Sequence, residues 1–289
     1  DMGYTIGGFN AAVTSRVLGG SGLSSSAAFE VLLVCILDGL YNDSIIDGVT
    51  RAKISQWVEN EYFGKPSGLM DQSACSIGGL VGIDFKNADP KIEAYSFDFE
   101  ARGFNVVVLA TNSSHDDLTD EYASIPAEMK AVAAALGGKV LRQFKVQQLI
   151  EKLPEVREKT SDRAVMRALH YYDENERVKA CYQAIEEGNL DAFLQNIILS
   201  GESSWKMLQN LYVGGKCEQS LALACALSER MLKGSGAWRV HGGGFAGTIL
   251  AFVPHYKRDA YVQQMDAVFG KGACTVLGIR PVGAKKVEL

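Results

Sequence analysis

The chain has 289 residues, enough for two domains or for one large domain. Its 29 basic and 34 acidic side chains give a net charge of −5, which disfavours a nucleic-acid partner. The apolar runs are far shorter than the roughly 18 residues that a membrane span needs, and we expect no secretory leader. Six cysteines without a Cys-x-x-Cys pair favour reduced thiols, so the composition predicts a cytoplasmic globular protein.

Alternating residues 9–17 predict a strand that leads into a glycine-rich stretch. Residues 18–28 are Leu-Gly-Gly-Ser-Gly-Leu-Ser-Ser-Ser-Ala-Ala, and a buried apolar helix is predicted from Ser25 to Leu40. The first amide groups of that helix lack intrahelical partners and lie at the positive end of its dipole, which suits a phosphate. An ordinary serine-capped helix after a glycine turn is the alternative interpretation.

The remaining elements follow in a mixed order. Helices are predicted at 45–62 and 68–77, then strands at 80–85, 92–99 and 104–111, a mostly helical region at 118–211, and finally helix 218–233, strand 237–253, helix 256–269 and strand 274–280. This order fits an α+β fold better than a doubly wound sheet. No linker or repeat marks a domain boundary, and we place it at residue 111.

Two common nucleotide-binding motifs fail on their context. A P-loop needs a lysine after its glycines, and residues 18–28 contain none. A Gly-x-Gly-x-x-Gly pattern occurs at Gly242, Gly244 and Gly247, but an extended apolar run follows it, where a dinucleotide fingerprint should open a helix. The glycine–serine stretch therefore belongs to another class of phosphate site.

Residues 18–28 resemble the phosphate loop of the GHMP kinases, with Leu18 in the position of a proline. Two further stretches are similar to motifs of the galactokinase branch, in the same order. Glu59 with 63–72 (Phe-Gly-Lys-Pro-Ser-Gly-Leu-Met-Asp-Gln) resembles the segment of the catalytic aspartate. Residues 239–248 resemble the late glycine motif, with departures at His241, Ala246 and Thr248.

The resemblance implies a two-domain α+β fold, with an N-terminal domain at 1–111 and a ferredoxin-like C-terminal domain at 112–289. It implies ATP and Mg²⁺ as cofactors, with Asp71 as the catalytic residue and Ser26 and Glu59 as metal ligands. The phosphate-binding residues would be Gly20, Gly22, Leu23, Ser24, Ser25 and Ser26. The substrate contacts would be Gly68, Asp71, Tyr122, Gly243 and Gly244.

Taken without the resemblance, each of these residues has an ordinary structural interpretation. Glu59 is then a solvated helix carboxylate, Asp71 a charge in the first turn of a helix, and Tyr122 a packed aromatic side chain. The glycines at 243 and 244 would form a tight structural turn.

The implied reaction is ATP-dependent phosphorylation of the anomeric hydroxyl of galactose. A kinase for another sugar or small alcohol, and a non-catalytic sensor that binds ATP and galactose, are the alternatives. The galactokinase motif Gly-Arg-x-Asn-Leu-Ile-Gly-Glu-His-x-Asp-Tyr has no counterpart here. We therefore expect a fragment that is inactive in isolation, with an exposed apolar edge that favours self-association.

Overall fold

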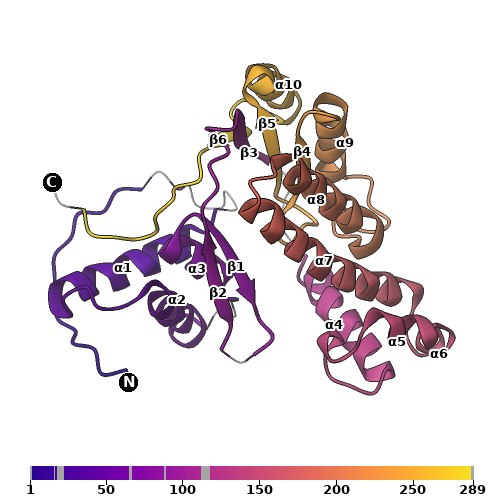
Figure 1. The fold of residues 1–289 in the computed structure, drawn as a ribbon, viewed down its shortest axis with the longest axis horizontal. Helices are drawn as coiled ribbons and strands as arrows, with labels where there is room; N and C mark the ends of the chain where they lie inside the picture. Colours follow the sequence, from indigo (N-terminus) through magenta and orange to yellow (C-terminus); the bar gives the residue numbers. More distant parts are fainter. Residues whose placement is uncertain are drawn as a thin grey trace. The chain divides into compact units, whose positions relative to one another are not determined.

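The computed structural model describes residues 2–15, 17, 23–64, 67–87, 89–111 and 118–287, which form two compact units (Figure 1). The first unit combines the chain up to Asp98 with the segment from Ile279 onward, and the second runs from Phe99 to Gly278. The predicted boundary at residue 111 differs from this division. Strand β3 (Phe104–Ala110) is hydrogen-bonded to strands of the second unit, and the final segment returns to the first.

The first unit consists of helices beside a short antiparallel hairpin. Its elements are α1 (Ser25–Tyr41), α2 (Gly48–Trp57), a π-helix (Val58–Tyr62), α3 (Met70–Ile77), β1 (Leu80–Asp84) and β2 (Lys91–Tyr95). The Asp47 side chain caps α2 by accepting from the amides of Val49 and Thr50, at 2.9 and 3.0 Å. The predicted helices are confirmed, whereas residues 9–15, predicted as a strand, have no strand pairing.

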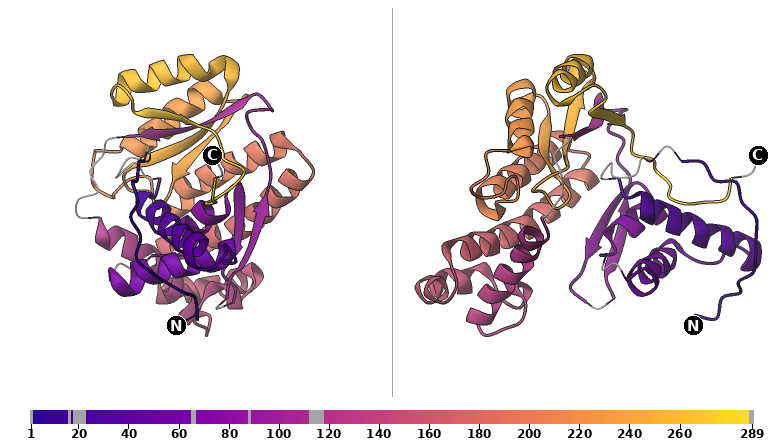
Figure 2. Two further views of the ribbon diagram at one scale, coloured as in Figure 1. Left: turned by 90° about the vertical axis from the view of Figure 1, so that its left-hand side faces the viewer. Right: turned by 180° about the vertical axis from the view of Figure 1, so that it is seen from behind.

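The segment from Ile279 onward completes the C-terminal end of α3. The amide of Gly283 donates to the carbonyl of Ile77 at 2.9 Å, and the amide of Ala284 donates to Cys75 at 3.1 Å. These carbonyls lie in the last turn of α3, where helices leave acceptors without intrahelical donors. Figure 2 shows both terminal segments running beside α1, and they line one cavity with it. The end of the chain therefore supports the helix that carries Asp71.

The second unit is built on an antiparallel sheet with the order β4-β5-β3-β6. Its other strands are β4 (Ala237–His241), β5 (Thr248–Pro254) and β6 (Cys274–Leu277), and β3 lies between β5 and β6. With α9 (Ser220–Leu232) before β4 and α10 (Arg258–Phe269) before β6, this is the ferredoxin-like arrangement that was predicted. The run from Val106 to Leu109 is buried on both faces, as expected for a central strand.

Alternation along the strands sends side chains to two helical layers. On one face Val107, Ile249 and Ala251 pack in a cluster with Leu221 of α9 and Met265 of α10. On the other face the ring of Phe252 lies 5.6 Å from that of Phe193, which belongs to α8 (Leu190–Ser203). Helices thus cover both faces of the sheet.

A helical layer extends from α8 away from the sheet (Figure 1). It contains α4 (Thr119–Ala135), α5 (Val146–Glu151), α6 (Leu153–Lys159) and α7 (Asp162–Glu186), packed around Val132, Leu149 and Val156. A second π-helix (Ser204–Leu208) continues α8. Among the helices of the described residues, none is long and apolar enough to cross a membrane.

We predict that Gly283→Ala lowers the free energy of unfolding by about 1–3 kcal/mol, as overpacking does elsewhere. A Cβ at this position would lie 2.1 Å from the carbonyl oxygen of Ser76 in α3, so the final segment must move. Urea denaturation measures the change. Gly278→Ala is the control, because its Cβ would meet only a carboxylate oxygen of Glu100 at 3.9 Å. An unchanged midpoint for Gly283→Ala would show that the segment does not support α3.

Candidate active site

The carboxylate of Glu59 is held between two helices of the first unit. Glu59 lies in the π-helix and is 4% exposed, and π-helical turns are frequent at functional sites. The hydroxyl of Ser26 in α1 donates to its Oε1 at 3.3 Å, and the Gln72 amide of α3 donates to its Oε2 at 2.7 Å. This burial excludes a solvated helix carboxylate.

A second polar contact joins the start of α1 to the start of α3. The Ser24 hydroxyl donates to Oδ2 of Asp71 at 2.5 Å. Ser24 precedes α1 with a left-handed backbone (φ 53°), and its side chain does not cap the helix. Asp71 is solvent-exposed in the first turn of α3. The structure therefore brings two predicted site residues together, with one carboxylate oxygen in this bond.

The negative charge of this region acts on a nearby thiol. Burial raises the pKa of Cys75 in α3, and the carboxylates of Asp71 and Glu30 raise it further. The thiol is therefore held in its neutral form, which is not a nucleophile. Cys75 is not a candidate for covalent chemistry here.

For the other phosphate and substrate contacts predicted in the first unit, the described structure gives no contact that indicates a role. Gly20 and Gly22 lie outside the described residues, so their role is a sequence prediction. Leu23 precedes Ser24, and Ser25 is the first residue of α1. A Cβ at Gly68 would meet no atom within 4 Å, so nothing within the described structure demands a glycine there.

In the second unit, Tyr122 holds the glycine loop, residues 242–247. Its hydroxyl donates to the carbonyl of Gly244 at 2.8 Å, and its ring makes an edge-on contact with Phe245 at 5.4 Å. Burial raises the pKa of Tyr122, so the hydroxyl stays protonated and donates. A Cβ at Gly243 would lie 2.8 Å from the Tyr122 ring. The close packing explains why position 243 is a glycine.

Asn210 holds the same loop from another segment. Its side-chain amide donates to the carbonyl of Gly243 at 3.0 Å, and its own carbonyl accepts the amide of Phe245 at 2.5 Å. Gly244 has a left-handed φ of 82°, and a Cβ there would lie 2.1 Å from the Asn210 carbonyl oxygen. Only glycine fits this position.

Sequence reasoning missed Gln72 and Asn210 as site residues, and it missed Glu30. Glu30 is 8% exposed, and its Oε2 lies 3.5 Å from the amide nitrogen of Gln72. A signal was available for Glu30, which is one of two charges in an apolar helix and lies one turn after Ser26. Asn210 gave no such signal, because its contacts to the glycine loop bridge more than 30 positions in the sequence.

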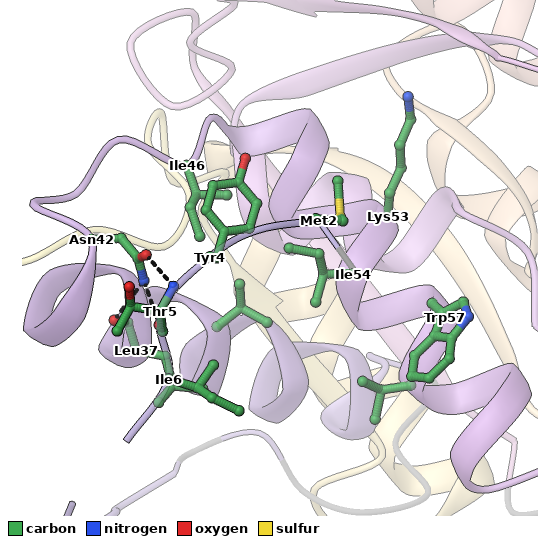
Figure 3. A pocket seen from close by; sticks show the side chains of 12 residues that line it. Met2, Tyr4, Thr5, Ile6, Leu37, Asn42, Ile46, Lys53, Ile54 and Trp57 are labelled. Carbon is green, nitrogen blue, oxygen red and sulfur yellow. Dashed lines mark hydrogen bonds between the residues drawn. The ribbon is translucent and has the colours of Figure 1, made fainter. Parts of the chain in front are cut away.

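A separate cavity of about 630 Å³ lies in the first unit (Figure 3). Met2 and Ile6 of the N-terminal segment line it with Leu37, Ile54 and Trp57 of α1 and α2. The segment is fixed there by Asn42, which accepts from the amide of Thr5 at 2.8 Å. The lining is mostly apolar, and Tyr4, Thr5, Asn42 and Lys53 add polar groups to it.

The donor set around Glu59 fits Mg²⁺. This ion takes oxygen ligands, commonly one or two from protein with phosphate and water oxygens. Ser26 and Glu59 supply such oxygens side by side, and Oε1 of the buried Gln72 has no hydrogen-bond partner within the described structure. In the described ranges, no group of three His, Cys, Asp or Glu side chains could hold a metal ion. Ser26 and Glu59 supply the one or two protein oxygens that Mg²⁺ commonly takes.

Comparisons with known proteins agree with this fold. Residues 1–79 match the family model of the GHMP kinases N terminal domain. The structure is similar to that of Lactococcus lactis galactokinase in complex with galactose, with a TM-score of 0.72 and 21% identity over 95% of this chain and 69% of that one. It is also similar to the L. major mevalonate kinase in complex with R-mevalonate, with a TM-score of 0.58, 17% identity, and 90% and 67% coverage. The fold is therefore that of the GHMP kinases.

The sequence relatives identify the branch of the GHMP kinases to which the chain belongs. The chain is 30% identical to the galactokinase of Pyrococcus furiosus over 92% of its length and 72% of the relative's. It is 30% identical to that of Streptomyces coelicolor, with 93% and 67% coverage. The chain belongs to the galactokinase family, whose members are ATP-dependent sugar kinases. It spans about two thirds of the length of the curated relatives it matches.

We predict that Tyr122→Phe lowers the free energy of unfolding by about 0.5–1.5 kcal/mol, because the Gly244 carbonyl loses one of its two donors and keeps only the amide of Ala246. Urea denaturation followed by tryptophan fluorescence measures this, because two of the three tryptophans, Trp205 and Trp238, lie in the second unit. Tyr256→Phe is the matched control, because Tyr256 is 79% exposed. Equal midpoints for both variants would contradict a role of the Tyr122 hydroxyl in holding the loop.

Proposed function

We propose that this protein transfers the γ-phosphoryl group of ATP to the anomeric hydroxyl of galactose. The bond between the γ-phosphorus and the β,γ-bridging oxygen breaks and a bond to the sugar oxygen forms. The O–H bond of the sugar hydroxyl breaks and its proton is released, and ADP and galactose 1-phosphate leave. Family membership supports the reaction class, and the names of the relatives support galactose as the acceptor.

The observation that carries the proposal is the contact between Ser24 and Asp71. It holds a carboxylate beside the N-terminal end of α1, where free amide groups favour a phosphate. Phosphoryl transfer requires the acceptor hydroxyl next to the phosphate, and little else from the protein. Only Oδ2 of Asp71 is bonded to Ser24 within the described residues, so Oδ1 is available to accept a hydrogen bond from the sugar hydroxyl.

The other site residues bind the phosphates, the metal ion and the substrate. The glycine–serine stretch from Gly20 to Ser26 binds the phosphates. Ser26 and Glu59 hold Mg²⁺, which offsets the negative charge of the transferred group when it is bound. Gln72 keeps the Glu59 carboxylate turned toward Ser26. Gly68, Tyr122, Gly243 and Gly244 are the further substrate contacts in this proposal.

Two alternatives use the same residues. A different acceptor would keep ATP turnover and change only the sugar or alcohol that supports it. A non-catalytic sensor would bind ATP and galactose without releasing ADP. A panel of acceptors, assayed with the 289-residue chain and with the longest form of the protein that contains it, separates the three. The comparison of the two forms also tests the expected inactivity of the isolated chain.

We predict that Asp71→Asn lowers kcat by about 10²–10⁴-fold, the usual contribution of a positioned acid or base. The affinity for ATP should change little, because the amide removes a charge near the acceptor and leaves the phosphate donors in place. Asp120→Asn is the control, because Asp120 is also an exposed aspartate in the first turn of a helix. Full turnover by Asp71→Asn would rule out the role of Asp71.

The metal site has its own test. Glu59→Gln should raise the Mg²⁺ concentration needed for half-maximal activity, because an amide oxygen carries no charge to attract the ion. Glu61→Gln changes an exposed carboxylate in the same π-helix and should leave the Mg²⁺ requirement unchanged. Equal Mg²⁺ dependence of the two variants would exclude Glu59 as a ligand.

We also propose that the first unit self-associates through α1, on which Phe29 and Leu32 are 49% and 37% exposed. Exposed apolar side chains on neighbouring turns favour burial against a second surface. Sedimentation velocity should show a concentration-dependent increase that Phe29→Ser/Leu32→Ser abolishes. A monomer at all concentrations would contradict this proposal.

A further inference from the structure

Arg167 of α7 is a charged side chain in the interior of the second unit. Only 1% of its surface is exposed. A buried guanidinium is costly unless its donors are matched by acceptors in good geometry. Arg167 therefore has to be explained by the groups that it binds.

The guanidinium joins two segments of the second unit, α4 and the second π-helix. On one side Nη1 donates to the Ser124 hydroxyl and to Oε2 of Glu128, both in α4 and both at 2.9 Å. On the other side Nε donates to the carbonyl of Leu208, the last residue of the second π-helix, at 3.1 Å. Arginine suits this role because its donors point in fixed, divergent directions.

Each of these two segments holds the glycine loop a few residues from its contact with Arg167. Tyr122, two positions before Ser124, binds the carbonyl of Gly244. Asn210, two positions after Leu208, binds the amide of Phe245. Since a trans peptide points its carbonyl and amide in opposite directions, the Gly244–Phe245 peptide is held from both sides.

The preceding peptide is oriented in the same way. Asn210 binds the carbonyl of Gly243, so the amide of Gly244 points away from Asn210. Within the part of the chain that the structure describes, this amide has no acceptor. Tyr122 and Asn210 together form a clamp on the loop. This clamp fixes the direction of the Gly244 amide, a backbone donor that is left for a ligand.

We infer that Arg167 is a positioning residue for the glycine loop. It sets the separation of Tyr122 and Asn210, and through them the orientation of the two peptides that follow Gly243. Its effect on catalysis rests on the proposed function, whereas its effect on the loop does not.

Hydrogen exchange of the 289-residue chain, read from peptides that cover residues 242–247, tests the inference. Arg167→Met should speed exchange in these peptides about tenfold or more. Without Arg167 the bonds of Tyr122 and Asn210 to the loop are weakened, so local opening of the loop costs less free energy. Arg163→Met is the matched control. Arg163 lies one turn earlier and also binds Glu128, at 2.9 Å, but its side chain is 47% exposed and the structure gives it no bond to Ser124 or Leu208.

Arg167→Lys separates charge from geometry. It keeps a cation for Glu128, but a compact ammonium cannot reproduce the divergent bonds to both segments. Compared with Arg167→Met, we expect Arg167→Lys to recover part of the unfolding midpoint. We expect no recovery of the protection of residues 242–247 from hydrogen exchange. Full recovery of loop protection by lysine would overturn the inference, and so would unchanged exchange in folded Arg167→Met or equal effects of Arg163→Met.

Ser124→Ala decides the matter if neither Arg167 variant folds. It removes one bond of the guanidinium in the turn that carries Tyr122, and should also speed exchange at residues 242–247. Unchanged exchange in this variant would overturn the inference.

Turnover provides a readout that depends on the proposed function. We expect kcat/KM to fall by about 10²-fold in Arg167→Met, as for a reactant displaced by about 1 Å, and to stay unchanged in Arg163→Met. If the unaltered protein shows no sugar kinase activity in its longest form, the proposed function fails. The exchange experiment then still decides the role of Arg167.

Discussion

The buried carboxylate of Glu59 is the constraint on which the first unit depends. A carboxylate at this depth is tolerated only if polar groups replace its lost water. Ser26 and Gln72 do so, and they come from α1 and α3. The need to satisfy one charge therefore fixes the π-helix against both helices. The same arrangement brings Ser24 to Asp71, so the candidate site is a consequence of how this charge is accommodated.

In the second unit, neutral polar groups hold the glycine loop in place. Its glycine loop has no buried carboxylate, and its peptides are oriented by Tyr122 and Asn210. Glycine is required at position 244 because a side chain would collide with the Asn210 backbone. Order in the loop therefore depends on the elements that carry its partners. This makes a residue as remote as Arg167 part of the loop's support.

Much of this could be predicted from local patterns. The helix from Ser25 and most of the strands follow from periodicity, whereas the ferredoxin-like domain and the roles of Ser26 and Glu59 at one site follow from family resemblance. The strand predicted at residues 9–17 was wrong for residues 9–15, because alternation shows only that a segment could pair and not that a partner strand lies beside it.

The contacts that were not predicted all join distant parts of the sequence. Arg167 and Asn210 are polar residues in helical surroundings, and nothing near them in the sequence distinguishes them from solvated side chains. Likewise, the unit boundary could not be placed at a single residue. The chain leaves the first unit at Asp98 and returns to it at Ile279, which only long-range packing reveals.

The return of the final segment to α3 has a consequence for biosynthesis. Gly283 and Ala284 bind the last turn of the helix that carries Asp71, yet roughly 200 residues separate them from it. At about 5–20 residues per second, a ribosome needs on the order of 10–40 s to make that stretch. During this time the whole second unit emerges and is free to fold, while α3 lacks its C-terminal partners. The residue proposed to act in catalysis thus lies on a helix that is completed only after the whole second unit has been translated.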